Sequence, residues 1–232
     1  MTRLELIPLD GIGEIRKGDD LAGSLIAAIE AADEELKNDD ILVVTHKVVS
    51  KAEGRVVEIV DEASYRALVE DEAAAIVRRR GDLVITQTRH GFICANAGVD
   101  RSNTEAGTAV LLPIDPDRSA HGLRTRIERS TGASIAVVVT DTFGRPWRRG
   151  LVDVAIGVSG LPSVLDLRGT VDGFGNVLDV TEVAVVDEIA AAADLVMGKA
   201  SRIPAAILRG LHLSGEGRAV DLVRPPEEDL FR

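Results

Sequence analysis

The sequence predicts a mixed fold of helices and strands, of the α+β class, with an α/β arrangement as the alternative. Segments with the periodicity of amphipathic helices are mixed with short runs of Val, Ile and Leu, which excludes the all-α and all-β classes. The alternation is too irregular to predict a doubly wound parallel sheet. With 232 residues and 45% hydrophobic content, the chain can bury one generous core or two smaller ones without disulfides or a structural metal.

Four segments carry the helical pattern. The clearest covers residues 20–36, where apolar residues fall on one face and acids occupy much of the other. The others lie at about residues 62–79, 116–130 and 186–196. Asp115 before Pro116 predicts an N-cap followed by proline at the first helical position. The arginines at 78–80 fall where the second helix should end, a place where cations complement the helix dipole.

Strands are predicted where aliphatic and β-branched residues cluster between these helices. A short strand precedes residue 11, and the other runs cover residues 41–44, 55–59, 83–86, 110–112, 135–139, 152–158, 164–167 and 205–208. Glycine-rich stretches near 169–176 and 210–217 are typical of turns, and no repeat or linker marks a boundary. We therefore expect one domain over residues 1–232, built as one body or as two closely packed parts. The polar tail from Ser214 is expected to be mobile.

Composition excludes several classes of protein. A formal net charge of -11 and an aromatic content of 3% argue against nucleic acid as a partner, because binding it needs basic stripes and stacking platforms. No segment reaches the roughly 18 uninterrupted apolar residues of a membrane span, and Glu5 interrupts the apolar N-terminal stretch that a signal peptide would need. We therefore expect a cytoplasmic protein. The single cysteine, Cys94, excludes an intramolecular disulfide and a cysteine zinc site, and is expected to be buried.

The most informative stretch is the apolar run 135–139, which ends in Thr140, Asp141 and Thr142 and leads into a loop broken by glycine and proline. An acid at the end of a buried strand is a common metal ligand, because the sheet holds its backbone while its side chain faces a cleft. The Asp141 carboxylate and the Thr142 hydroxyl are hard oxygen donors suited to Mg²⁺ or Mn²⁺, and arginines from Arg145 onward could face phosphate. An aspartate that only caps a turn is the alternative.

Asp100 lies in a similar setting, among the small residues of segment 91–103. Such residues let backbone approach a ligand closely, and Asp100 with Asn103 offers a carboxylate and an amide three positions apart. An Asx-turn without function is the alternative.

Two further segments carry donors for a nucleotide. The GxG at 11–13 follows a short strand, but Arg16 stands where a Rossmann fingerprint needs its third glycine, and no GxxxxGK[ST] occurs. A simple turn is the alternative there. The run 43–51 combines an apolar strand with hydroxyls, His46, Lys47 and Lys51, which are donors that phosphate oxygens need. Its alternative is an amphipathic strand with solvated lysines. The remaining histidines are isolated and no HExxH or GxSxG occurs, so we expect neither a zinc site nor a serine or cysteine nucleophile.

Taken in order, these motifs resemble the coenzyme F420:L-glutamate ligase family, the γ-glutamyl ligases of F420 biosynthesis. The resemblance rests on GIGE at 11–14, VTHKVVSK at 44–51, AGVDRSN at 97–103 and TDTFGRPWR at 140–148, with later matches at 180–184 and 187–196. It covers the chain to about residue 210. Each motif is modest alone, but the ordered set is specific.

The resemblance implies a GTP-dependent ligase that adds L-glutamate, through its γ-carboxylate, to coenzyme F420-0 or a close precursor. The reaction would pass through an acyl phosphate and release GDP and phosphate. Two divalent ions, Mg²⁺ or Mn²⁺, are implied, with K⁺ as a further candidate cation. Asp100 and Asp141 would bind one metal and Thr142 the second, and Asp100, Asp141 and Lys51 would serve catalysis. The residues implied to contact GTP are Gly11, Ile12, Gly13, Glu14, His46, Lys51 and Asn103.

Two positions depart from the family pattern. The family often has serine in place of His46, and Lys199 cannot supply the amide with which some members bind a metal. The resemblance further implies a two-part α+β fold unlike Rossmann and P-loop proteins, an intertwined homodimer, and no fused C-terminal reductase domain. A metal-dependent phosphotransferase, an acid–amine ligase for another acceptor and a non-catalytic nucleotide-binding module remain the alternative functions.

Overall fold

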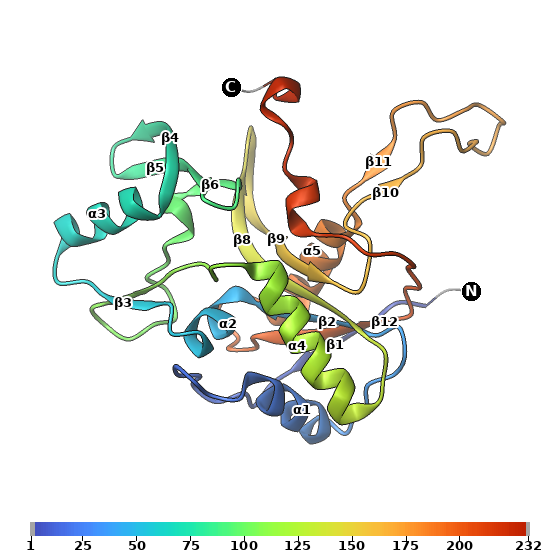
Figure 1. Ribbon diagram of the computed structural model, residues 1–232, viewed down its shortest axis with the longest axis horizontal. Helices are drawn as coiled ribbons and strands as arrows, with labels where there is room; N and C mark the ends of the chain where they lie inside the picture. Colours follow the sequence, from blue (N-terminus) through green and yellow to red (C-terminus); the bar gives the residue numbers. More distant parts are fainter. Residues whose placement is uncertain (1–2, 231–232) are drawn as a thin grey trace.

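The computed structural model describes residues 3–230 and has a mixed five-stranded sheet at its centre (Figure 1). The strand order is β1-β12-β2-β8-β9, with bounds Glu5–Leu9, Ala205–Arg209, Ile41–Thr45, Ala136–Arg145 and Arg148–Ser159. Strands β2 and β8 run parallel, and the other neighbours are antiparallel. The prediction of a mixed fold of helices and strands is confirmed.

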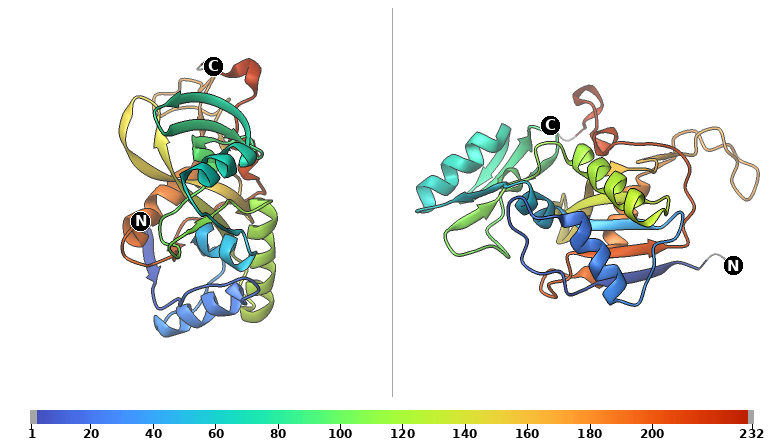
Figure 2. Two further views of the ribbon diagram at one scale, coloured as in Figure 1. Left: turned by 90° about the vertical axis from the view of Figure 1, so that its left-hand side faces the viewer. Right: turned by 60° about the horizontal axis from the view of Figure 1, so that its bottom comes forward.

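Each face of this sheet is covered by helices, because successive side chains of a strand point to opposite faces. Leu42 and Val44 of β2 belong to a core with α1 (Leu21–Ala31) and α4 (Pro116–Thr131). Ile41 and Val43 belong to a second core with α5 (Val185–Met197). Figure 2 shows α1 and α4 together on one side of the sheet. The central strands are apolar throughout because both of their faces are buried.

A smaller group of elements has its own core beside the sheet. Helix α3 (Glu62–Glu72), the sheet β4-β5-β6 (Ala73–Arg80, Leu83–Thr88, Ile93–Ala95) and the pair β3 (Val56–Glu58) and β7 (Thr108–Val110) make up this group. Tyr65 and Val69 of α3 pack there against Ala109 and Leu111. The short helix η1 (Asn96–Gly98) leads from β6 toward Asp100.

The helix expected over residues 62–79 is wrong in its second half. Helix α3 ends at Glu72, and Ala73 begins strand β4, so the arginines at 78–80 lie on an exposed strand rather than at a helix end. Strand β4 pairs with β5 from Ala73 to Arg80. The β-branched residues Ile76 and Val77 favour this pairing, and tertiary contacts override the helical period.

The strand predicted at residues 41–44 is confirmed, and the alternative of an amphipathic strand through residues 43–51 is wrong. Strand β2 ends at Thr45, and helix α2 (His46–Ala52) follows without a loop. Lys51 is 9% exposed, so it is not a solvated lysine of a surface strand. In the helix, Lys47 and Lys51 are one turn apart and share a face. Helix α1 likewise ends at Ala31, before the expected residue 36, and Asp33 has a left-handed φ of 57° just after it.

Strand β8 does not end where the apolar run ends. It continues to Arg145 and forms a long hairpin with β9, whose turn contains Trp147 at a φ of 58°. The loop expected after Thr142 is therefore strand as far as Arg145, because residues 140–145 pair with β9. A second hairpin, β10 (Leu165–Asp166) and β11 (Glu182–Val183), carries the glycine-rich turn expected near 169–176 and projects from the body in Figure 1.

The C-terminal tail is docked, in contrast to the mobility expected from Ser214 onward. It contains the short helices η2 (Ala219–Leu222) and η3 (Pro226–Glu228). Ala219 is fully buried, and its N–H donates to Asp117 of α4 at 2.9 Å. Cys94 is buried, as expected. Within residues 3–230, no helix combines the length and the apolar character needed to cross a membrane.

Candidate functional site

A cavity of about 660 Å³ lies where β2 ends, beside the middle of β8. These strands are parallel neighbours, and Thr45, the last residue of β2, pairs with Thr140 of β8. Helix α2, the loop at residues 12–15, the loop at 103–105 and the end of α5 complete the walls. Of the predicted site residues, those that line the cavity are Ile12, Gly13, Glu14, Lys51, Asn103 and Thr142. Gly11 adjoins them, whereas His46, Asp100 and Asp141 lie outside this lining.

Lys51 joins three of the predicted nucleotide segments. Its Nζ forms an ion pair with Glu14 and donates to the carbonyl oxygen of Asn103 at 3.0 Å. Glu14 is more than half exposed, so this ion pair is open to solvent on the glutamate side. Residues 11–14, α2 and the loop at 103 thus surround one ammonium group.

Lys47, one turn before Lys51, is paired with Asp100. Its Nζ lies 2.8 Å from the Asp100 Oδ2 atom and donates to the Ser102 hydroxyl at 3.2 Å. Burial opposes ionisation of Asp100, but Lys47 and the N–H and hydroxyl of Ser102 outweigh it and hold the pKa of this carboxyl below its usual value. The sequence shows Lys47 as a donor; that its partner is Asp100 emerges only from the fold.

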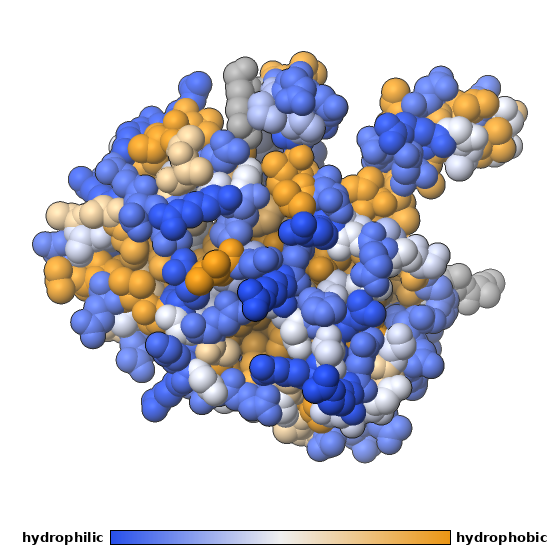
Figure 3. All heavy atoms as spheres, in the orientation of Figure 1, coloured by the Kyte–Doolittle hydropathy of each residue, from blue (hydrophilic) through white to orange (hydrophobic). Residues whose placement is uncertain are grey.

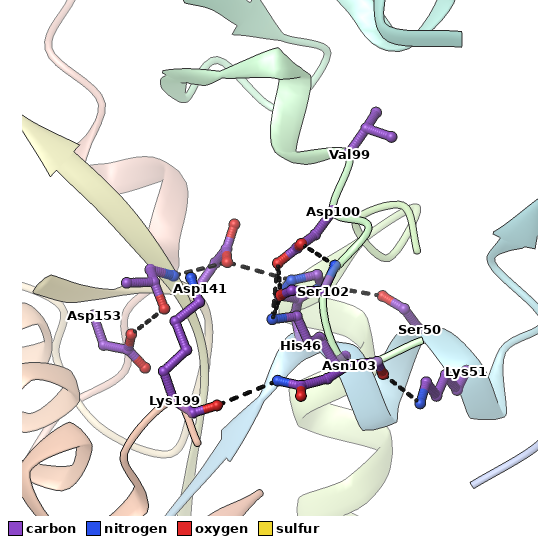
Figure 4. Close-up of polar contacts among 12 residues, drawn as sticks. His46, Ser50, Lys51, Val99, Asp100, Ser102, Asn103, Asp141, Asp153 and Lys199 are labelled. Atoms are coloured by element: carbon purple, nitrogen blue, oxygen red, sulfur yellow. Dashed lines mark hydrogen bonds and ion pairs between the residues drawn. The ribbon is translucent and has the colours of Figure 1, made fainter. Parts of the chain in front are cut away.

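The His46 ring lies against the Asp141 carboxylate. The His46 ring is completely buried, and its Nε2 lies 3.3 Å from the Asp141 Oδ1 atom, while Nδ1 lies 3.4 Å from the Ser50 hydroxyl. Asp141 Oδ1 also accepts from the Thr142 N–H at 2.7 Å. Figure 4 shows the ring between Asp141 and Ser50. The histidine side chain therefore lies against the carboxylate rather than lining the cavity.

Asp153 is a cavity residue that the motifs do not indicate. It faces Thr142 across the β8–β9 hairpin and accepts from the hydroxyls of Thr142 at 2.7 Å and Thr140 at 2.9 Å. Burial raises the pKa of Asp153, and the charges of Asp194 and Asp141 act in the same direction, against the two threonine hydrogen bonds. Its position depends on the hairpin register, which the sequence pattern does not reveal.

Lys199 closes the side of the cavity near α5. Its carbonyl oxygen accepts from the Asn103 amide at 3.3 Å, and its side chain extends toward Asp141 in Figure 4. Gly198 before it has a φ of 56°, a conformation that favours glycine. Arg145, in contrast, is exposed at the hairpin tip, donates to the Arg149 carbonyl oxygen and does not line the cavity. The cations at the cavity are lysines together with Arg202.

The oxygen donors fit a divalent cation bound together with phosphate. Among residues 3–230, no three His, Cys, Asp or Glu side chains cluster as a complete metal site. Such a cluster is not required, because Mg²⁺ is usually held by one or two carboxylates, with waters and substrate phosphates completing the shell. Asp100 already binds a cation, the Lys47 ammonium, and Asp141 and Thr142 add a carboxylate and a hydroxyl near the same strand end.

The chain is similar in sequence to one family of enzymes. A model of the F420-0:Gamma-glutamyl ligase family matches residues 11–210. This range includes every predicted site residue and stops just after β12.

Individual relatives match over nearly the whole chain. A coenzyme F420:L-glutamate ligase of Methanothermobacter thermautotrophicus is 42% identical and covers 99% of both chains. The enzyme of the same name from Methanopyrus kandleri is 44% identical, over 99% of this chain and 97% of the relative. The enzyme of the same name from Methanocaldococcus jannaschii is 41% identical, over 85% of this chain and 86% of the relative.

Proposed function

The chain belongs to the F420-0:gamma-glutamyl ligase family, and from this premise we infer that it is a coenzyme F420:L-glutamate ligase. It is thus an acid–amino-acid ligase of coenzyme F420 biosynthesis, acting on F420-0 and L-glutamate. The observation that carries this inference is the similarity at 42% and 44% identity across 99% of the chain. A match of this length spans both the main sheet and the smaller group of elements.

We propose that GTP occupies the cavity of about 660 Å³. Lys51 supports this, since its ammonium is buried among three cavity segments and its partner Glu14 is exposed enough to be displaced. Gly11 to Glu14 and Asn103 would contact the nucleotide beside it. Lys47 would face the phosphates when Asp100 turns to a metal ion.

Two divalent ions, Mg²⁺ or Mn²⁺, are proposed to enter with GTP. Asp100 and Asp141 would hold one ion and Thr142 the other, and K⁺ is a further cation to be tested. Asp141 and Thr142 are consecutive residues of a strand, so their side chains point to opposite faces and suit two ions better than one. When bound, the ions would neutralise the triphosphate and the transferring phosphoryl group.

The chemistry requires activation, because a carboxylate is a poor electrophile. A carboxylate oxygen of F420-0 would attack the γ-phosphorus of GTP, giving an acyl phosphate and GDP. The amine of L-glutamate would then attack the acyl carbon, lose a proton and expel phosphate. A γ-glutamyl linkage requires that the γ-carboxylate of a glutamate already in place serve as the next acceptor. Lys47 and Lys51 would balance charge at the phosphates, and His46 would keep Asp141 oriented.

We further propose that the enzyme works as a homodimer in the cytoplasm. The β10–β11 hairpin projects from the body, and Figure 3 shows apolar side chains on the projecting part. Phe174 and Val180 of this hairpin are 95% and 86% exposed. Large exposed apolar side chains on a projecting arm are typical of a surface that another chain covers.

One assay tests the function. The protein is incubated with GTP, MnCl₂, KCl, L-glutamate and F420-0, and products are separated by mass. The expected products are glutamylated F420 and an equal amount of GDP. GDP without a glutamylated product would favour a phosphotransferase, a product only with another acid would favour a different acceptor, and neither product would favour a non-catalytic module.

A further inference from the structure

The Asp153 carboxylate lies outside every motif that carries the family resemblance, yet it lines the cavity. It is 5% exposed and is held by two hydroxyl groups of the neighbouring strand. Two neutral hydroxyl groups offset only part of the free-energy cost of burying a carboxylate, so its presence calls for a role.

We propose that Asp153 is a positioning residue for the second divalent ion: it fixes the Thr142 hydroxyl so that the oxygen lone pairs face the cavity. The inference rests on the proposed function, from which the ion and GTP come. Asp153 would touch neither substrate nor metal and would act through Thr142 alone.

The hairpin register places the two side chains together. Thr142 is directly opposite Asp153 on β9, so both point to the same face of the sheet. A shift of register between Val139 and Thr140 precedes this pair, and without it Thr142 would face a different residue. The bulge is therefore part of the site.

The direction of the hydrogen bond between Thr142 and Asp153 determines how the Thr142 hydroxyl can bind an ion. Thr142 Oγ1 donates to Asp153 Oδ1 at 2.7 Å, so its single proton is committed to the carboxylate. Both lone pairs of the hydroxyl remain to accept or to coordinate, and the oxygen gains negative charge. A hydroxyl without such an acceptor would rotate freely before the ion binds, and binding would have to remove that freedom.

A second hydrogen bond keeps the carboxylate itself in place. Thr140, which is completely buried, donates to Asp153 Oδ2 at 2.9 Å and does not line the cavity. Thr140 thus anchors one oxygen while the other serves Thr142. Asp194 of α5 lines the same cavity, so an ion at Thr142 would have a further carboxylate nearby.

Mn²⁺ binding tests the proposal apart from turnover. The whole protein is titrated with Mn²⁺ in the presence of a non-hydrolysable GTP analogue, and free Mn²⁺ is measured by electron paramagnetic resonance. Asp153→Asn is expected to lower the Mn²⁺ affinity of one of the two sites about 10-fold and to leave that of the other unchanged. Loss of a residue that hydrogen-bonds to a metal ligand commonly has an effect of this size. The matched control is Asp187→Asn, since Asp187 is another carboxylate bonded to β9, through the Ala155 N–H, and lies away from the cavity lining.

A double variant separates positioning from a merely structural role. In a Thr142→Val background, Asp153→Asn should cause no further loss of Mn²⁺ affinity, because the hydroxyl through which Asp153 acts on the ion has been removed. An additional loss there, or wild-type affinity in Asp153→Asn, overturns the proposal. If Asp153→Asn does not fold, Thr140→Val replaces it: about 3-fold weaker binding of one ion is expected, and unchanged binding overturns the proposal. A wild type that binds no Mn²⁺ and forms no glutamylated product refutes the proposed function instead.

Discussion

At the scale of single residues, Asp141 has the most constrained position. It follows three fully buried valines of β8, and a buried imidazole lies against its carboxylate. The sequence predicts its setting at the end of a buried strand, but not the histidine beneath it, because β2 and β8 become neighbours only in the folded sheet.

Replacing this carboxylate should stop the reaction without unfolding the chain. Asp141→Ala is expected to lower GTP-dependent glutamylation at least about 100-fold, since it removes a proposed metal ligand. Initial rates by mass spectrometry and the melting temperature by calorimetry measure the two effects. Asp82→Ala, at an exposed aspartate of the β4–β5 turn, is the control and should retain full activity. Near-normal rates in Asp141→Ala would remove Asp141 from the metal site.

Cys94 gives a prediction that does not depend on function. Burial raises the pKa of its thiol to about 12, and the nearby charge of Asp141 adds to the shift. The thiolate fraction therefore stays very small at pH 8 and grows only as the pH approaches this value. Iodoacetamide at pH 8 should label the native protein at least about 100-fold more slowly than the urea-unfolded chain, as followed by intact mass. Comparable rates in a folded sample would show that the thiol is accessible.

At the scale of elements, prediction succeeds where one physical effect dominates. Helix α4 begins at Pro116 behind the Asp115 cap, as expected, because the capping side chain and the proline act locally. Residues 73–80 and 140–145 could not be assigned in the same way, since their strand state depends on pairing with β5 and β9. The same limit applies to the site: Asp100, Asp141 and Lys51 stand in motifs, whereas Asp153 and the Lys47–Asp100 pair follow from register and packing.

Helix α4 also contains a glycine that its structure does not require. A Cβ at Gly122 would meet no atom within 4 Å, and its φ is not left-handed. Gly122→Ala should therefore raise the free energy of unfolding by about 0.5–1 kcal/mol, through the lower entropy of the unfolded chain and the higher helix propensity of alanine. Chemical denaturation measures this change.

Gly157→Ala is the matched control for Gly122→Ala. A Cβ at Gly157 of β9 would lie 2.4 Å from the Pro116 carbonyl oxygen, so the variant should be destabilised as the first turn of α4 is pushed away. If Gly122→Ala is instead less stable than the wild type, the packing around α4 differs from that described.

At the scale of the whole molecule, three cores are arranged around one site. Two lie on the faces of the main sheet and the third lies under α3, and the cavity takes lining residues from loops that connect these parts. The sequence predicts mixed α/β character and enough apolar residues for one generous core or two smaller ones. It does not predict how the parts meet, because such contacts join residues far apart in the chain.

The proposed homodimer is tested by sedimentation. Analytical ultracentrifugation should give a mass twice the 24.6 kDa of one chain. The double variant Phe174→Ser with Val180→Ser should weaken association at least about 10-fold, because it removes apolar area from the projecting hairpin. Leu195→Ser, at an apolar residue of α5 that is 83% exposed, is the control. A monomeric wild type, or a double variant that associates as the wild type does, would exclude this hairpin as the contact.

The ion pairs of Lys47 with Asp100 and of Lys51 with Glu14 have a consequence for selectivity. Each ammonium of α2 carries its own internal counterion, so neither lysine presents an unbalanced charge to passing anions. A ligand can bind both lysines only if it brings phosphate groups to pair with their ammonium groups. It must also bring a cation to pair with the carboxylates that the lysines release. Inorganic phosphate alone can pair with the ammonium groups but brings no cation for the carboxylates. Under the proposed function, the cleft would favour a metal-bound triphosphate over free anions such as inorganic phosphate.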